Sequence, residues 1–240
     1  MFKEYDFSQS NIKFNFDEYY MEKERSGDKE YLLSFIIKQR WARDLIDFYN
    51  SDTKAILIKN CPIDIKLPLS PIDTGYINPS DYSLVSDFIL TLHKIINIIP
   101  YAYQDENRGK LFRSLVPVQT SEDMVGSYGS KYEFKFHSDN PTYKIYPEYK
   151  QNSLNAPEFL SLFCIRGQEN VHTNVVLLKD ILNNLDKSTI DILEQNIFTV
   201  NTPDSFDKYH EVPNVSVIGQ YKDKYYTRFD YHNIKGTKKV

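Results

Sequence analysis

The sequence is poor in cysteine, glycine and histidine, and each shortage excludes a class of protein. Its two cysteines, Cys61 and Cys164, lie far apart and lack the spacing of a zinc site or a disulfide framework. Both are therefore predicted to be reduced, buried thiols of a cytoplasmic protein. Eight glycines among 240 residues exclude a chain built from flexible low-complexity linkers. With only five histidines, each one can be considered individually.

An excess of positive charge and a long apolar run are also lacking. The formal net charge of −4 gives no electrostatic reason to expect a nucleic-acid partner. The N-terminal residues 1–20 are charged throughout and hold no apolar core of a signal peptide. The apolar run over 88–100 is interrupted by His93 and Lys94 and is too short to span a bilayer. We therefore expect a cytoplasmic protein without nucleic-acid or membrane partners, and its oligomeric state stays open.

Aromatic residues are abundant, with 19 tyrosines and 15 phenylalanines. Apolar residues at helical spacing predict helices over 28–50, 80–99 and 178–196. Short β-branched or aromatic runs between turn residues predict strands over 55–63, 109–118, 132–136, 158–167, 172–178, 214–220 and 224–232. This order predicts an α+β chain built round a sandwich or barrel. We expect a single domain over 1–240, with a helical part at 1–53 and the core at 54–240.

The run YEFKFHSDNPTY over 132–143 carries a histidine and an aspartate two positions apart. On a strand such residues point to the same face, so His137 and Asp139 would lie side by side opposite a packed aromatic face. Two interpretations stay open at this point. The pair is a solvated strand end whose two side chains hydrogen-bond, or it supplies two ligands of a two-histidine, one-carboxylate Fe(II) site.

Seven short segments follow one another along the chain in an order that is typical of one protein family. They are AILIKNCPI (55–63), ENRGKLFRSLVP (106–117), FHSDNPTY (136–143), PEFLSLFCIRG (157–167), HTNVVLL (172–178), DSFDKYH (204–210) and YYTRFD (225–230). In this order they resemble the clavaminate synthase-like, or TauD-like, Fe(II)/2-oxoglutarate-dependent dioxygenases of the compact amino-acid hydroxylase type. The resemblance spans roughly residues 54 to 231, with an apparent insertion over 144–155. It implies a double-stranded β-helix (jelly-roll) core with flanking N-terminal helices.

The resemblance implies that His137 and Asp139 bind Fe(II) together with a distal histidine. Longer members carry that histidine well past the RFD segment, whereas this chain ends at Val240. The available candidates are His210 and His232, and we favour His210 as the third ligand.

The resemblance also implies two residues that bind 2-oxoglutarate. A basic residue a little after the distal histidine receives the far carboxylate of this co-substrate. Arg228 fits best because its planar fork can hold a carboxylate bidentately, and Lys224 is the substitute. Thr173 stands at the position of a co-substrate-binding threonine on the strand that follows the PEFLSLFCIRG segment. Neither His93, expected to pack or cap on a helix, nor His172, expected to point away from Thr173, is a candidate ligand.

The reaction implied by the resemblance is hydroxylation of a free amino acid or a small molecule derived from one, with succinate and CO2 as co-products. An intact carboxylate at Asp139 fills the iron position that related halogenases leave to halide, so hydroxylation is favoured over chlorination. Candidate substrate contacts are Gln119, Glu133, Asn140 and Asp230, although each could equally be a solvated surface residue. Acidic contacts favour a cationic side chain such as that of lysine or arginine.

Two alternatives belong to other classes of function. If the third ligand is missing, the chain is a dioxygenase-like fold that acts as a non-catalytic binding or partner protein. A hydrolase is disfavoured, because the run VGSYGS has Val125 where the Gly-x-Ser-x-Gly elbow around Ser127 needs a glycine. That run also precedes a predicted strand, whereas the elbow opens a helix.

Overall fold

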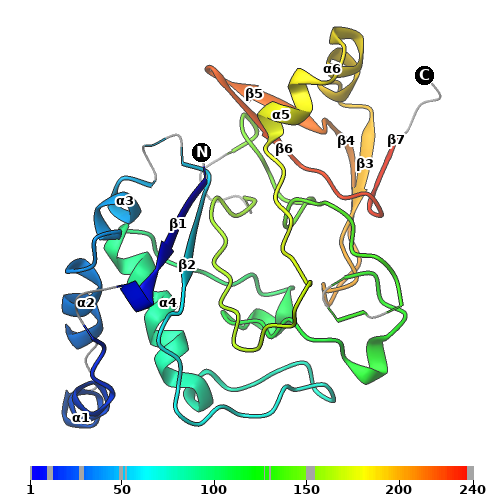
Figure 1. The fold of residues 1–240 in the computed structure, drawn as a ribbon. Coiled ribbons are helices and arrows are strands. Elements are labelled where there is room, and N and C mark those ends of the chain that lie inside the picture. Colours follow the sequence, from blue (N-terminus) through cyan, green and yellow to red (C-terminus); the bar gives the residue numbers. More distant parts are fainter. Residues whose placement is uncertain are drawn as a thin grey trace. The chain divides into compact units, whose positions relative to one another are not determined.

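Figure 1 shows the computed structural model, which describes residues 2–9, 13–26, 30–48, 51, 53–126, 128–129, 131–149 and 155–236. The chain divides into two compact units. Unit 1 comprises Met1–Ser70, Ile77–Tyr101 and Ser161–Gly167, and unit 2 comprises Pro71–Tyr76, Ala102–Leu160 and Gln168–Val240. The single domain with a boundary at residue 53 stays a prediction. Ser127 of the disfavoured hydrolase motif and residues 150–154 of the apparent insertion lie outside the described residues.

Unit 1 is built on a parallel pair of strands. β1 (Phe2–Asp6) pairs with β2 (Ala55–Lys59), and the short 3-10 helix η1 (Phe7–Gln9) follows β1 (Figure 1). A parallel pair needs a crossover connection, which here carries α1 (Phe16–Ser26), α2 (Glu30–Ile37) and α3 (Ala42–Ile46). The strand at 55–63 is thus confirmed in its first part. β1 was not predicted because charged residues interrupt its apolar ones.

The helix expected over 28–50 is wrong as one element, because the chain turns between α2 and α3. The side-chain amide of Gln39 donates to the Phe35 carbonyl at 3.2 Å, and its backbone amide donates to the Ile36 carbonyl at 2.9 Å. The turn brings Trp41 into the core, where it is 4% exposed. Burial of this large ring outweighs the continuation of the helix.

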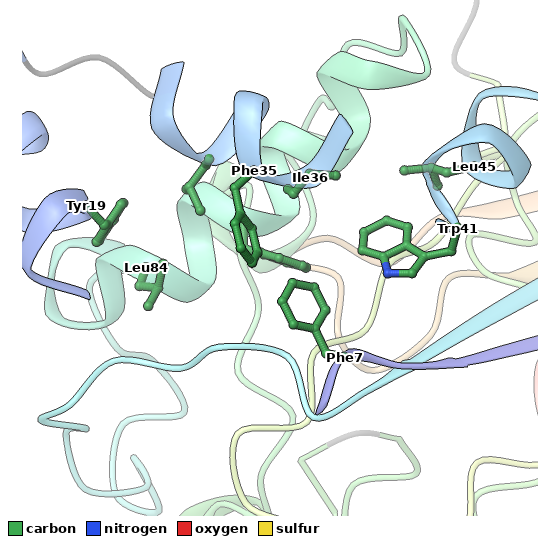
Figure 2. Packing of buried hydrophobic residues seen from close by; sticks show 9 residues of the cluster. Phe7, Tyr19, Phe35, Ile36, Trp41, Leu45 and Leu84 are labelled. Carbon is green, nitrogen blue, oxygen red and sulfur yellow. The ribbon is translucent and has the colours of Figure 1, made fainter. Parts of the chain in front are cut away.

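Aromatic rings dominate the core of unit 1 (Figure 2). The Phe7 ring lies 5.3 Å from that of Phe35, and 6.0 Å from those of both Trp41 and Phe88. The buried members are Phe7, Tyr19, Leu32, Phe35, Ile36, Trp41, Leu45, Leu84 and Phe88. Tilted and edge-on ring pairs of this kind add about 0.5–1.5 kcal/mol each beyond the burial of their area. Phe7 therefore anchors the end of β1 to the helices.

The helix expected over 80–99 is confirmed in its main part by α4 (Ser83–Ile95), which follows the 3-10 turn η3 (Pro79–Tyr82). A remote carboxylate caps the N-terminus of α4. Asp64, 7% exposed, accepts hydrogen bonds from the backbone amides of Leu84 at 3.0 Å and Val85 at 3.1 Å. The acceptor satisfies amides that have no partner within the helix, and its charge complements the helix dipole.

Unit 2 combines short antiparallel strands with short helices. Its elements are η4 (Asn107–Gly109), η5 (Gln119–Ser121), α5 (Leu178–Asn183), α6 (Lys187–Leu193), β3 (Phe198–Asn201), β4 (Glu211–Val215), β5 (Ile218–Tyr221), β6 (Lys224–Thr227) and β7 (Ile234–Gly236). β3 lies between β4 and β7, and β5 pairs with β6 as a hairpin (Figure 1). The mixed helix-and-strand class is thereby confirmed, as are parts of the strands expected over 214–220 and 224–232. The helix expected over 178–196 is two helices, because Asp186 caps a new one by accepting from the Thr189 amide at 2.8 Å.

The strands expected over 109–118, 132–136, 158–167 and 172–178 are wrong for this structure. The described residues between 102 and 197 hold isolated bridges and helices but no strand. The expected packed aromatic face is absent from this part too, because the residues at 132, 134 and 136 are 59%, 51% and 53% exposed. Alternation in the sequence indicates an extended backbone, whereas a strand also needs a neighbour to share its hydrogen bonds.

Membrane-spanning helices were not expected. None of the helices in the described ranges is long and apolar enough to cross a bilayer.

Replacement of Asp64 by alanine tests the remote cap of α4. The Leu84 and Val85 amides would lose their acceptor, and we expect the free energy of unfolding to fall by about 1–2 kcal/mol, the range for helix caps. Urea denaturation followed by circular dichroism measures this loss. Asp81→Ala, which removes an exposed carboxylate from the neighbouring turn, should change stability by less than about 0.5 kcal/mol. Equal losses in the two variants would contradict the capping role.

Candidate metal and co-substrate site

His137 and Asp139 lie where their segment meets the one that follows β6. His137 forms an isolated antiparallel bridge with Asp230. The Ser138 amide donates to the Phe229 carbonyl at 2.6 Å, and the Phe229 amide donates to Ser138 Oγ at 2.9 Å. These bonds fix the backbone on either side of Ser138, so the two flanking side chains emerge from one anchored point.

The His137 and Asp139 side chains are neighbours. Nε2 of His137 lies 3.7 Å from Oδ1 of Asp139. Nδ1 lies 2.8 Å from the carbonyl oxygen of Lys135, which can only accept, so Nδ1 is the donor, and in the neutral ring the lone pair lies on Nε2. The ring stacks on Phe134 with centroids 4.1 Å apart. An imidazole nitrogen and a carboxylate oxygen side by side are donors that suit Fe(II), so the residues present fit two of its three expected ligands.

The third expected ligand does not lie with them. Within the described ranges no group of three or more histidine, cysteine, aspartate or glutamate residues could hold a metal ion. His210 is exposed just before β4, where its amide donates to Thr202 Oγ1 at 3.0 Å. His232 lies in a turn, and its amide donates to Asp230 Oδ1 at 2.9 Å. The structure therefore brings together His137 and Asp139 and neither distal candidate.

A partly buried carboxylate, Glu106, lies close to the pair. Its Oε2 accepts from the Asn140 side chain at 3.0 Å, and its Oε1 lies 3.3 Å from Arg113 Nη1. Burial raises the pKa of Glu106 and the charge of Asp139 raises it further, while Asn140 and Arg113 act in the opposite direction. Asn140 itself is 6% exposed. Glu106 was not predicted as a site residue, because a glutamate in the charged run ENRGK is typical of a surface residue.

Arg228, the predicted co-substrate ligand, is enclosed in unit 2. It is 1% exposed, and its Nη2 forms an ion pair with Glu148 Oε2. Its Nε is buried and has no hydrogen-bond partner. Such an orphaned donor on a guanidinium fits a carboxylate, which is the group that Arg228 is expected to bind.

The other predicted contacts are either exposed or engaged in local hydrogen bonds. Thr173 and Gln119 are exposed, and the exposed Glu133 forms an ion pair with Lys135. Asp230 is buried at 7%, and its carboxylate accepts from the amides of His232 and Asn233 and from the Asn233 side chain. Its bonds close a local turn. Of the four predicted substrate contacts, Asn140 is the one whose side chain hydrogen-bonds to Glu106 in the described residues.

Both cysteines are free thiols. Cys61 donates to the Ile58 carbonyl at 3.4 Å, and burial raises the pKa of its thiol to about 12. Of the two thiols expected to be buried, Cys61 is half-buried and Cys164 is exposed, so the expectation is wrong for Cys164.

Unit 2 also has an open pocket of about 340 Å³. Its lining residues are Met124, Thr202, Pro203, Asp204, Phe206 and Tyr209. Phe206 forms a bridge with Glu106, and Thr202 holds the backbone of His210. The pocket thus borders two residues of interest without containing the His137–Asp139 pair.

Comparison with known proteins gives relatives that act on amino acids. The chain is 26% identical over 190 residues to L-asparagine oxygenase of Streptomyces coelicolor, covering 75% of this chain and 53% of that protein. It is 26% identical over 105 residues to L-lysine 3-hydroxylase of Catenulispora acidiphila, covering 44% of this chain and 26% of that protein. No family model matches the chain. The chain thus spans about half or less of the length of these relatives.

Solved structures of asparagine oxygenase share the fold. One, in complex with Fe(II), 2S,3S-3-hydroxyasparagine and succinate, superposes with a TM-score of 0.70 at 22% identity, covering 88% of this chain and 66% of that chain. Another superposes with a TM-score of 0.71 at 21% identity, covering 98% and 73%. These findings confirm the resemblance predicted from the sequence to iron-dependent oxygenases of amino acids.

The raised pKa of Glu106 predicts a pH-dependent stability of the metal-free protein. The folded state holds this proton more tightly than the unfolded chain, whose glutamate has a pKa near 4.5. The stabilising contribution is full below that value and is lost as the pH rises through the higher pKa of the folded state. Glu106→Gln keeps an acceptor for Asn140 but cannot titrate, so this fall in stability should be missing from the variant.

Melting temperatures recorded from about pH 4 to about pH 7 for both proteins measure the effect. Glu133→Gln removes an exposed carboxylate and serves as the control, with an expected profile like that of the unmodified chain. Identical profiles for the Glu106 variant and the unmodified chain would show that the Glu106 carboxyl is not perturbed.

Proposed function

We propose that the chain is an Fe(II)/2-oxoglutarate-dependent hydroxylase of a free amino acid or a small molecule derived from one. The observation that carries this proposal is the His137–Asp139 pair, whose Nε2 and Oδ1 atoms lie 3.7 Å apart while Nδ1 is engaged by the Lys135 carbonyl. The named activities of the relatives, oxygenation of asparagine and hydroxylation of lysine, support this class of reaction. An intact carboxylate at Asp139 favours hydroxylation over halogenation.

Bound Fe(II) would supply the activation of oxygen that hydroxylates an unactivated carbon while 2-oxoglutarate becomes succinate and CO2. The residues of the chain bind and orient the reactants. His137 and Asp139 would hold the metal through Nε2 and a carboxylate oxygen. Phe134, stacked on the imidazole, restricts the rotation of His137 and so preserves the direction of its lone pair.

His210 is our candidate for the third ligand. Its segment precedes β4 in unit 2, the unit that also holds His137 and Asp139. An exposed histidine can reorient toward a metal when the metal is present, because metal binding contributes free energy to ordering its ligands. His232 is the alternative ligand.

Arg228 and Thr173 are proposed to hold the far carboxylate of 2-oxoglutarate. The unpartnered Nε of the buried Arg228 supports this role, since a carboxylate would satisfy it. The hydroxyl of Thr173 can add a second donor. Lys224 is the substitute for Arg228.

Substrates with a cationic side chain, such as lysine or arginine, fit the acidic surroundings of the pair best. Glu106 adds a carboxylate beside Asp139, and only Arg113 offsets it within that cluster. Asn140 can add an amide contact. Gln119, Glu133 and Asp230 are weaker candidates, because two are exposed and the third is engaged in its own turn.

We also propose that the shared fold includes a double-stranded β-helix. The fold likeness to asparagine oxygenase supports this proposal. A cytoplasmic location is proposed on the two free cysteines.

A second candidate function is a binding or partner protein that keeps the dioxygenase fold without iron turnover. One observation favours it: in the described part of the chain neither His210 nor His232 joins the His137–Asp139 pair. The two candidates differ in whether the chain binds Fe(II) and 2-oxoglutarate together.

Anaerobic titration with Fe(II) and 2-oxoglutarate distinguishes the two functions. The hydroxylase should develop a visible metal-to-ligand charge-transfer band, and His137→Ala and His210→Ala should each abolish it because each removes a ligand. His232→Ala is the matched control and should retain the band. If only the His232 variant among the two distal variants lost the band, His232 would be the third ligand. If the unmodified chain developed no band, the binding or partner protein would be favoured.

Succinate release in the presence of single amino acids tests the substrate class. We expect lysine or arginine to stimulate release at least about tenfold more than asparagine does. The reason is that an ion pair between a carboxylate and a cationic side chain is stronger, by about 1.4 kcal/mol or more, than a hydrogen bond from a neutral amide. Glu106→Gln should reduce this preference. A stronger response to asparagine would refute the cationic preference and leave the hydroxylase proposal intact.

A further inference from the structure

Arg228 and Glu148 form a charged contact that the proposed reaction does not use. Arg228 follows β6, and its amide donates to the Val217 carbonyl at 3.0 Å. Its side chain is enclosed, at 1% exposure, whereas that of Glu148 is 29% exposed. One partner of the pair is thus sealed inside the unit while the other reaches solvent.

Glu148 occupies only part of the carboxylate-binding edge of the Arg228 guanidinium. Nε and Nη2 lie on one edge of the arginine fork, and that edge binds a carboxylate with two parallel hydrogen bonds. Glu148 engages Nη2, while Nε stays unpartnered. The resident carboxylate therefore uses half of the edge that an incoming carboxylate would use in full.

The segment that carries Glu148 is docked against the β5–β6 hairpin. The Tyr146 ring lies 5.1 Å from the Tyr221 ring and 4.9 Å from the Tyr226 ring. A Cβ built at Gly219 would come within 2.2 Å of the Tyr146 carbonyl oxygen, so only glycine admits this approach. The backbone is thereby positioned by packing, and the Glu148 side chain alone can leave Arg228 without undoing the docking.

We propose that Glu148 is an internal competitor for the carboxylate-binding edge of Arg228. With no dicarboxylate present, it neutralises a buried cation that would otherwise be costly to leave unpaired. A dicarboxylate of the length of 2-oxoglutarate displaces it and satisfies both Nε and Nη2. The net binding free energy of the co-substrate at Arg228 is then the difference between the free energies with which its carboxylate and that of Glu148 bind the arginine. This inference rests on the proposed function in one respect, the assignment of Arg228 to the co-substrate.

Calorimetric titration of metal-free protein with 2-oxoglutarate and with glutarate tests the competition. Glu148→Gln removes the resident charge, and we expect it to tighten binding by about tenfold, within the usual range of coupling between two ligands. Glutaramide, which has the same length without charge, should bind neither protein. Asp191→Asn removes one carboxylate of an exposed ion pair with Lys187 in the same unit and should leave affinity unchanged.

The rise in melting temperature on adding 2-oxoglutarate is a second readout, which a purely structural role of Glu148 would not change. Glu148→Gln should melt lower than the unmodified chain without ligand and gain more from added 2-oxoglutarate, because the ligand replaces the missing counter-charge. If that variant does not fold, Glu148→Asp, which shortens the reach by one methylene, should show a smaller effect of the same sign.

The outcomes separate this inference from the proposed function. Equal affinities of the Glu148 variant and the unmodified chain for the dicarboxylates would overturn the competition. So would the failure of both proteins to bind 2-oxoglutarate or glutarate. Tighter binding in the Glu148 variant that Arg228→Lys cancels would support it. Failure of the iron titration together with tighter binding would refute the hydroxylase and retain the competition at Arg228.

Discussion

The contact between Ser138 and Phe229 is the constraint on which the candidate site depends. It joins two segments far apart in the sequence by short bonds in both directions. One segment carries His137 and Asp139, and the other carries Arg228. Without this junction the proposed metal donors and the proposed co-substrate residue would have no fixed relation within unit 2. Because the bonds involve the backbone and one small hydroxyl, they do not engage the side chains of His137, Asp139 or Arg228.

Buried charge is the second organising feature of unit 2. Arg228 is enclosed against Glu148, and Arg113 lies against Glu106 with its Nε buried and unpartnered. Leaving a buried charge without its partner costs about 3–5 kcal/mol, so each pair commits its two segments to one arrangement. In return, each arginine keeps donors that are not fully used.

The main part of α4 and parts of the two hairpin strands could be predicted because their signals are local. The apolar spacing of α4 and the alternation of β6 are periodic over one element, and both elements formed. The extended runs around Phe134 carry an equally clear alternation, yet no strand formed there, because a strand is defined by its neighbour. The single helix expected around Trp41 failed for a related reason, since burial of that ring decided where the chain turns.

The sequence by itself determined the donors, because the His-x-Asp spacing is a property of three consecutive residues and holds His137 beside Asp139. It also determined the resemblance to iron-dependent amino-acid oxygenases, since the order of short motifs survives low identity. Only the tertiary structure decided that Glu106 lies near this pair and that Glu148 reaches Arg228. Such contacts join residues far apart in the chain, as the Glu106–Asn140 bond does at a separation of 34. Long-range contacts follow from packing and the pairing of buried charge, which no local pattern records.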